Sequence, residues 1–244
     1  SLFALGPLCG VADPDLVLAA AAKCDALGLD TISAGATLAF AMECGERGEL
    51  SDGPVFGDDP SEWLSLIATR EGLGDFLAEG SRLMAESIGG DALSRAPQVK
   101  GLELPGYEPR TLQTMALGLA VGTRGADHNR SGAYEADFSE EANRLHGDAR
   151  SVALAIESED RAAVLDALVL CKFVRGAFDD LYDESATLLN AVTGTDADGA
   201  EIETIARRIV DLRKAFNIRE GWQPEDDTLP GRFLTEPIPS GPAK

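Results

Sequence analysis

Residues 13–30 read DPDLVLAAAAKCDALGLD, and this stretch carries the start and stop signals of one α-helix. Asp13 is a typical N-cap residue, and Pro14 follows it at the first helical position. Gly28 stands where a left-handed C-cap residue is expected. The segment therefore predicts a helix that runs from Pro14 to the residue before Gly28.

The same helical punctuation recurs along the rest of the chain. Runs of valine, isoleucine and aromatic residues between turn residues do not recur at short spacing, so the sequence predicts an all-α, multihelical fold. The stretch 98–110 is rich in proline and glycine, and it predicts an extended crossing between a first helical domain (1–100) and a second (101–244). The tail from Trp222 is expected to lack regular structure. Further helices are expected over 36–47, 60–68, 73–88, 111–121, 149–156, 160–173, 185–192 and 201–216.

The charge balance excludes several classes of function. Among 244 residues, 21 Lys and Arg stand against 42 Asp and Glu, which gives a formal charge of −21 at pH 7. Nucleic acids and anionic membranes are bound mainly by neutralising phosphates, so a surface this acidic repels both. No apolar run approaches the roughly 18 residues of a membrane-spanning helix. With 44% hydrophobic residues, the composition predicts a soluble globular protein.

Four cysteines are spread along the chain without a CxxC pair. This spacing fits a reducing compartment better than a disulfide framework, so we expect a cytoplasmic protein. Cys9, Cys24 and Cys44 are expected to be small core residues. The chain opens at Ser1 with apolar residues and without a signal-peptide pattern, and we expect that it begins within a longer protein.

Two stretches of the chain resemble each other, namely DALGLD at 25–30 and DALVLC at 166–171. Both read DALxL followed by a residue that can serve as a ligand or a hydrogen-bond acceptor. In a protein rich in alanine and leucine helices, two helix ends of similar sequence explain the repeat about as well as a duplicated binding motif. The two sequences alone do not decide between these interpretations.

Six ordered segments stand out along the chain, namely DALGLD (25–30), AFAMEC (39–44), VKGLELPGYEPR (99–110), RGADHNR (124–130), DALVLCKF (166–173) and FNIREGWQPEDDTLPGRF (216–233). Taken together, they resemble segments of the tungsten-dependent aldehyde ferredoxin oxidoreductases. The resemblance is to the carboxy-terminal, helical part of such an enzyme, and it covers nearly the whole chain. It implies that an amino-terminal β-rich domain lies outside this sequence, as does a CxxCxxxC segment with three ligands of the family's four-iron four-sulfur (4Fe-4S) cluster.

The resemblance implies cofactor contacts for both repeated motifs. In the family two pterins chelate one tungsten or molybdenum, and each motif lies at a helix end against one pterin. Asp25 and Asp166 are implied to accept hydrogen bonds from pterin N–H groups, because a carboxylate offers two acceptor oxygens side by side. The alternative for each is a capping or solvated carboxylate. Val169 departs from the family pattern, since a glycine is expected there. The further pterin contacts implied are Leu29, Asp30, Leu170 and Lys172.

Cys171 is the fourth ligand of the 4Fe-4S cluster that the resemblance implies. A single cysteine in an apolar helix is more often an inert buried thiol, and this is the alternative. The chain contains no further ligands with cluster spacing, which also disfavours a small ferredoxin-like electron carrier. We therefore expect that the isolated chain holds neither the cluster nor tungsten, and that it is inactive alone.

The segment 124–130 gathers cations in an acidic chain. Arg124 and Arg130 suggest an anion, and the resemblance implies that they contact the phosphate and pterin groups of the cofactor. His128 resembles the active-site histidine and is the candidate catalytic residue, because it can donate a hydrogen bond to an aldehyde oxygen or relay a proton. The alternative is that both arginines pair with nearby acids and that His128 caps a helix.

The reaction that the resemblance implies converts an aldehyde and water to a carboxylic acid, and passes two electrons from tungsten through the cluster to ferredoxin. The implied partners are the aldehyde, ferredoxin and the amino-terminal domain of the same polypeptide. A metal-free helical scaffold or partner-binding module derived from this fold is the alternative function. Outside the motifs, His146 is expected at the surface, and Glu43 is expected to be a buried acid with a structural partner.

Overall fold

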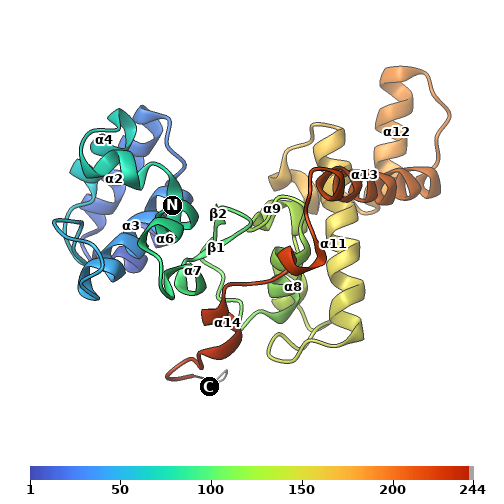
Figure 1. Ribbon diagram of the computed structural model, residues 1–244. Helices are drawn as coiled ribbons and strands as arrows, with labels where there is room; N and C mark the ends of the chain where they lie inside the picture. Colours follow the sequence, from blue (N-terminus) through green and yellow to red (C-terminus); the bar gives the residue numbers. More distant parts are fainter. Residues whose placement is uncertain (242–244) are drawn as a thin grey trace. The chain divides into compact units, whose positions relative to one another are not determined.

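The computed structural model describes residues 1–241, and most of them are helical (Figure 1). Within these residues the β-structure is one antiparallel hairpin, in which Gln98 pairs with Glu103 and Val99 with Leu102. The prediction of an all-α protein is therefore confirmed. The α-helices are α1 (Leu2–Leu5), α2 (Pro14–Leu27), α3 (Thr31–Glu46), α4 (Ser61–Thr69), α5 (Leu73–Leu77), α6 (Gly80–Ile88), α7 (Ala92–Arg95), α8 (Gln113–Val121), α9 (His128–Ser131), α10 (Tyr134–Asp137), α11 (Ala149–Ala167), α12 (Leu181–Thr193), α13 (Gly199–Arg219) and α14 (Gly231–Thr235). The strands are β1 (Gln98–Val99) and β2 (Leu102–Glu103), and the 3-10 helices are η1 (Pro7–Cys9), η2 (Lys172–Ala177) and η3 (Pro224–Asp226).

The chain divides into two units, each with its own internal contacts. Unit 1 comprises Ser1–Glu108 together with Leu229–Ile238, and unit 2 comprises Pro109–Thr228 together with residues 239–241. The chain thus leaves unit 1 after the β-hairpin and returns to it for the short helix α14. Among the described residues, every helix is either too short or too polar to cross a lipid bilayer.

Unit 1 is built around α3, whose side chains are buried on all faces from Ala34 to Cys44 except at Glu43. A helix that is apolar all round belongs in the interior. The helix α1 crosses it at Gly35, where a Cβ atom would lie 2.4 Å from the carbonyl oxygen of Ala4. Glycine is required at this position because the two backbones lie too close together for any side chain.

Three of the four cysteines belong to the core of unit 1, as expected. Cys9, Cys24 and Cys44 are fully buried among apolar side chains. Burial raises the pKa of the Cys9 thiol to about 12. Burial, reinforced by the charge of Glu49, raises that of Cys44 to about 11. These thiols are therefore protonated at neutral pH and unreactive while the unit is folded.

Several predicted helix boundaries were wrong, and a specific contact explains two of them. The helix expected over 73–88 is two helices, since Gly80 has φ +81° and Glu103 Oε1 lies 2.9 Å from where its Cβ would be. The helix expected from residue 36 begins at Thr31, because Asp30 Oδ1 accepts a hydrogen bond of 2.7 Å from the Ser33 N–H. The helices expected over 149–156 and 160–173 form one helix that ends at Ala167, and the tail contains η3 and α14.

Unit 2 is organised by its longest buried helix, α11. This helix packs against α8, α9 and α13, while α12 packs against α13 (Figure 1). Apolar side chains such as Leu154 and Leu165 line its inner face. Asp160 is buried on the same helix and pairs with Arg207 of α13, whose Nε donates to Asp160 Oδ2 at 2.7 Å. This pair joins α11 to α13, while Asp166, near the carboxyl end of α11, contacts Arg130 of the RGADHNR segment.

Candidate functional site

The first repeated motif, DALGLD, forms the carboxyl end of α2. The Leu29 N–H donates to the carbonyl of Cys24 at 2.9 Å, and the Gly28 N–H donates to that of Asp25 at 3.3 Å. Gly28 has φ +70°, in the left-handed region. These bonds form a Schellman C-cap, in which a left-handed residue reverses the chain after the helix.

The second motif, DALVLC, repeats this geometry at the end of α11. The Leu170 N–H donates to the carbonyl of Leu165 at 2.8 Å, and the Val169 N–H donates to that of Asp166 at 3.2 Å. The two motifs are therefore equivalent helix ends, as one of the two open interpretations held. A binding role is an addition to that structural role and does not compete with it.

Val169 occupies the left-handed position with φ +57°. For a residue with a Cβ this conformation costs roughly 1–2 kcal/mol, and β-branching makes it rarer still. The side chain is 91% exposed, so no packing of Val169 within unit 2 offsets the cost. Strain of this kind at a surface site is typical of positions where the backbone serves a function.

The three predicted pterin contacts of the first motif differ from one another in their surroundings. Asp25 is exposed, and its carboxylate accepts no hydrogen bond from residues 1–241. Asp30 uses Oδ1 to cap α3, which leaves its other oxygen for a ligand. Leu29 and Asp30 both line a pocket of about 250 Å³ within unit 1. The first motif therefore combines an open acceptor at Asp25 with a pocket beside Asp30.

Asp166 of the second motif lies among cations. Arg130 Nη1 lies 3.2 Å from Asp166 Oδ2, and Arg213 Nη2 lies 3.8 Å from it. The Oδ2 atom is buried, yet no N–H or O–H of the described residues donates to it with hydrogen-bond geometry. The two arginines therefore compensate its charge but leave one hydrogen-bond position open. The sequence offered no signal for Arg213, which is on α13.

The RGADHNR segment is organised by Asp127, which the sequence reasoning did not single out. Its Oδ1 accepts hydrogen bonds from the backbone N–H groups of Asn129 at 2.8 Å and Arg130 at 3.2 Å, and so caps α9. Its Oδ2 accepts from Arg124 Nη1 at 2.8 Å. Both arginines therefore pair with acids, as the alternative interpretation held, and the cap is Asp127 rather than His128. An aspartate directly before a short polar helix is the local signal that identifies it.

His128 is the first residue of α9 and is half-buried. Its ring centroid lies 6.4 Å from that of Tyr134, with the ring planes tilted by 44°. Lys172, from the second motif, donates to the carbonyl of Asn129 in the same helix. Burial lowers the pKa of Lys172, and the charges of Asp166 and other acids oppose that shift. Unit 2 thus brings the RGADHNR segment and the DALVLCK segment together.

Cys171 is exposed and free at the start of η2, next to half-buried Leu170. It therefore differs from the three core cysteines in being accessible to a metal or an electrophile. Across residues 1–241, groups of three or more His, Cys, Asp and Glu side chains with metal-site geometry are absent. A single exposed thiolate can contribute one ligand to a cluster that other residues complete.

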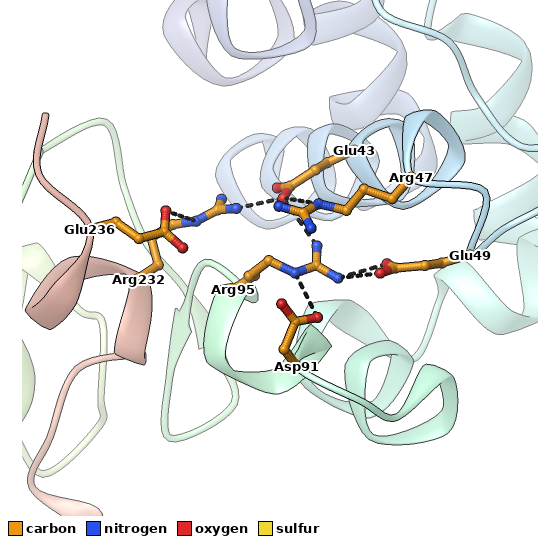
Figure 2. Close-up of polar contacts among 7 residues, drawn as sticks. All are labelled: Glu43, Arg47, Glu49, Asp91, Arg95, Arg232 and Glu236. Carbon is orange, nitrogen blue, oxygen red and sulfur yellow. Dashed lines mark hydrogen bonds and ion pairs between the residues drawn. The ribbon is translucent and has the colours of Figure 1, made fainter. Parts of the chain in front are cut away.

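The prediction for His146 is confirmed, and that for Glu43 is confirmed in its structural partners but not in full burial. His146 is exposed. Glu43 is half-buried, and its Oε1 contacts Arg47 Nε at 3.1 Å, Arg95 Nη1 at 3.0 Å and Arg232 (Figure 2). Burial raises the pKa of Glu43, but the hydrogen bonds and charges of Arg232 and Arg95 outweigh burial and lower it. Glu43 is therefore an ionised structural acid.

Comparison with known proteins gives consistent matches over the whole chain. A family model described as aldehyde ferredoxin oxidoreductase, domains 2 & 3, matches residues 1–244. The tungsten-containing aldehyde ferredoxin oxidoreductase of Pyrococcus furiosus is 38% identical over 259 residues, and that of Thermococcus kodakarensis is 37% identical over 257. Both alignments cover 100% of this chain and 42% of the relative. The chain thus spans less than half the length of these relatives.

More distant similarities extend the same pattern. The aliphatic sulfonate oxidoreductase, WOR-like subunit, of Pyrococcus furiosus is 29% identical over 260 residues, covering 98% of this chain and 38% of the relative. Among solved structures, the active site complex BamBC of benzoyl coenzyme A reductase, in complex with 1,5-dienoyl-CoA, has a TM-score of 0.71. It is 23% identical, and the match covers 93% of this chain and 42% of that chain. At this identity the likeness concerns the fold alone.

Proposed function

The chain belongs to the aldehyde ferredoxin oxidoreductase family as its domains 2 and 3, and from this premise we propose that it forms the helical part of the site for a tungsten bis-pyranopterin cofactor. The bound cofactor supplies the two-electron chemistry that converts an aldehyde and water to a carboxylic acid. The rest of the polypeptide completes the site, and ferredoxin receives the electrons through a 4Fe-4S cluster. Molybdenum in place of tungsten requires the same contacts from this chain.

The open position on Asp166 Oδ2 carries this proposal. A buried carboxylate oxygen without a hydrogen-bond donor is costly unless a ligand supplies one. The edge of a pterin is a row of N–H donors beside a carbonyl, and an aspartate accepts from two of them side by side. Arg130 and Arg213 compensate the negative charge of Asp166 without occupying this position. The residues present therefore fit the group.

The RGADHNR segment supplies charge and a proton in this proposal. Arg124 donates to Asp127 through one nitrogen only, which leaves other guanidinium N–H groups for phosphate oxygens of the cofactor. Arg130 lies between Asp127 and Asp166, so it links the segment to the pterin contact. His128 then holds a proton at its imidazole for the aldehyde oxygen and takes up the proton released by the attacking water.

The second motif continues the site beyond Asp166. Leu170 and Lys172 flank Cys171, and in this proposal they contact the pterin from either side of it. Cys171 is accessible, so it can serve as the fourth ligand of the cluster whose other three ligands lie elsewhere in the polypeptide. In the first motif, Asp25, Leu29 and Asp30 contact the second pterin.

The test uses the complete polypeptide that carries this chain. Tungsten is measured by elemental analysis, and the pterin is released by oxidation and measured by fluorescence. The Asp166→Asn and Asp25→Asn variants each lose charge-assisted hydrogen bonds worth about 1.5–3 kcal/mol. After dilution, we therefore expect each variant to retain about one tenth or less of the pterin that the wild-type polypeptide retains. Asp196→Asn, at an exposed loop position, is the matched control and retains it. A complete polypeptide without pterin or metal would instead support the metal-free scaffold.

A further inference from the structure

The pocket that Leu29 and Asp30 line also contains polar side chains for which the proposed function gives no role. It lies wholly in unit 1, between the α2–α3 junction, α3, the α5–α6 junction and the β-hairpin. Its volume of about 250 Å³ is below the roughly 300–1,000 Å³ of sites that enclose a whole small molecule. A pocket of this size admits one edge of a larger ligand.

Glu103 forms the wall of this pocket on β2 and is only 6% exposed. Its Oε1 accepts hydrogen bonds from the backbone N–H of Ser81 at 2.9 Å and from the Ser81 hydroxyl at 3.0 Å, which caps α6. Its Oε2 accepts no hydrogen bond from residues 1–241, and no cation of those residues pairs with Glu103. One carboxylate oxygen is therefore explained by the fold, and the other is not.

Thr37 lies opposite on α3 and lines the same pocket. It is 4% exposed, and its hydroxyl has no hydrogen-bond partner within the described part of the chain. Asp30, two helical turns earlier on α3, contributes the carboxylate oxygen that its cap does not use. The pocket therefore offers two carboxylate oxygens that accept and one hydroxyl that can donate or accept.

We propose that Glu103 and Thr37 are further pterin contacts, which select the donor-rich edge of the pterin held by Leu29 and Asp30. This proposal rests on the proposed function and deepens it. The pyrimidine edge of a pterin presents an amino group and a ring N–H next to a carbonyl. Glu103 Oε2 and Asp30 accept from the N–H groups, and the Thr37 hydroxyl donates to the carbonyl. The free-energy cost of burying the Glu103 carboxylate is then compensated by hydrogen bonds from the ligand as well as from Ser81.

The experiment again uses the complete polypeptide and measures released pterin per protein, together with the urea midpoint of unfolding. Glu103→Gln keeps the oxygen that caps Ser81 and replaces the other by an NH₂ group that opposes a pterin donor. We expect at least a tenfold fall in bound pterin with an unchanged midpoint. Thr37→Val preserves shape and is expected to lower pterin about threefold to tenfold. Glu86→Gln, an exposed residue of α6 that pairs with Arg82, is the control and keeps the wild-type content.

The outcomes separate this inference from the proposed function. If the wild-type polypeptide carries pterin and Glu103→Gln and Thr37→Val both carry the same amount, Glu103 and Thr37 are not contacts, and the proposed function stands. If Glu103→Gln lowers the unfolding midpoint, Thr37→Val alone decides, and full pterin content in that folded variant overturns the inference. Loss of pterin in either folded variant, with Glu86→Gln unaffected, supports it.

Discussion

Replacing Arg95 by methionine tests how much a buried ion-pair cluster stabilises unit 1. The Arg95 side chain is 2% exposed and lies between three carboxylates (Figure 2). Its Nη2 donates to both oxygens of Glu49 at 2.7 Å, its Nη1 to Glu43 at 3.0 Å and its Nε to Asp91 at 3.2 Å. Methionine fills most of the same volume without the charge, so the substitution isolates the electrostatic contribution.

The magnitude follows from the surroundings of each carboxylate. Asp91 is 67% exposed, so its contact contributes under about 1 kcal/mol. Glu43 keeps Arg47 and Arg232, whereas Glu49 loses both of its bonds to Arg95. Charged hydrogen bonds contribute about 1.5–3 kcal/mol each, and removing one partner of a buried ion pair costs about 3–5 kcal/mol. We therefore expect unit 1 to lose about 3–5 kcal/mol of unfolding free energy.

The assay exploits the distribution of tryptophan. The chain has two tryptophans, with Trp63 in unit 1 and Trp222 in unit 2. In a Trp222→Phe background, fluorescence during urea unfolding reports unit 1 alone. With a urea slope of about 2 kcal/mol per M, the midpoint of Arg95→Met is expected about 1.5–2.5 M lower. Arg82→Met, which breaks an exposed ion pair with Glu86, is expected to change the free energy by less than about 0.5 kcal/mol.

One result refutes this reasoning. If Arg95→Met unfolds at the same urea concentration as Arg82→Met, the buried cluster does not stabilise unit 1. Hydrophobic replacement then compensates the lost ion pairs, as it does for some buried salt bridges.

Four other expectations concern single positions. Val169→Gly removes the left-handed strain of roughly 1–2 kcal/mol, but glycine increases the conformational entropy of the unfolded chain, which offsets about 0.4–1 kcal/mol of this. The free energy of unfolding of unit 2, measured in urea, is therefore expected to rise by about 0.5–1 kcal/mol. Gly80→Ala is expected to lower the free energy of unfolding by about 2 kcal/mol, since its Cβ would lie 2.9 Å from a carboxylate oxygen. Gly28→Ala is expected to lower it by only about 1 kcal/mol, since nothing lies within 4 Å of that Cβ, and equal losses would contradict this. The pKa of Glu43 is lowered in the folded chain, so its ionised form stabilises unit 1 above the pKa of the unfolded carboxyl, and this stabilisation is lost as pH falls towards the folded pKa. Glu43→Gln is therefore expected to make the free energy of unfolding less dependent on pH between about pH 5 and 3. Cys171 is expected to react with a thiol reagent in the folded chain, while the three buried cysteines react only in urea; four fast thiols would contradict the core assignment.

Part of the candidate site could be predicted from the sequence, and the rest depended on packing. The resemblance named Asp166 and Lys172 in one segment and Arg130 in another, and unit 2 brings these three residues together. The partnership of Arg213 with Asp166 joins helices α13 and α11, and no local pattern indicates it. Glu103 lies within VKGLELPGYEPR, and no role is predicted for it from the sequence. Its burial against α6 is a consequence of the tertiary structure.

The sequence alone determined the features that depend on a few adjacent residues. Asp13 caps α2, and Gly28 ends it in the left-handed conformation, because capping bonds join groups within about four residues of each other. The same local chemistry ends α11 at DALVLC, even with valine in the left-handed position. The helical class followed from the repetition of such signals along the chain.

Only the tertiary structure decided which charged side chains are buried and what they contact. Arg95 lies in a short polar segment that is typical of a surface helix, yet it is enclosed by Glu43 and Glu49, and Arg232 reaches the same Glu43 from the far end of the chain (Figure 2). The break at Gly80 likewise depends on Glu103, which is 23 positions away. Contacts of this kind form when distant segments pack together, and their free energy comes from desolvation and charge pairing that no local pattern encodes.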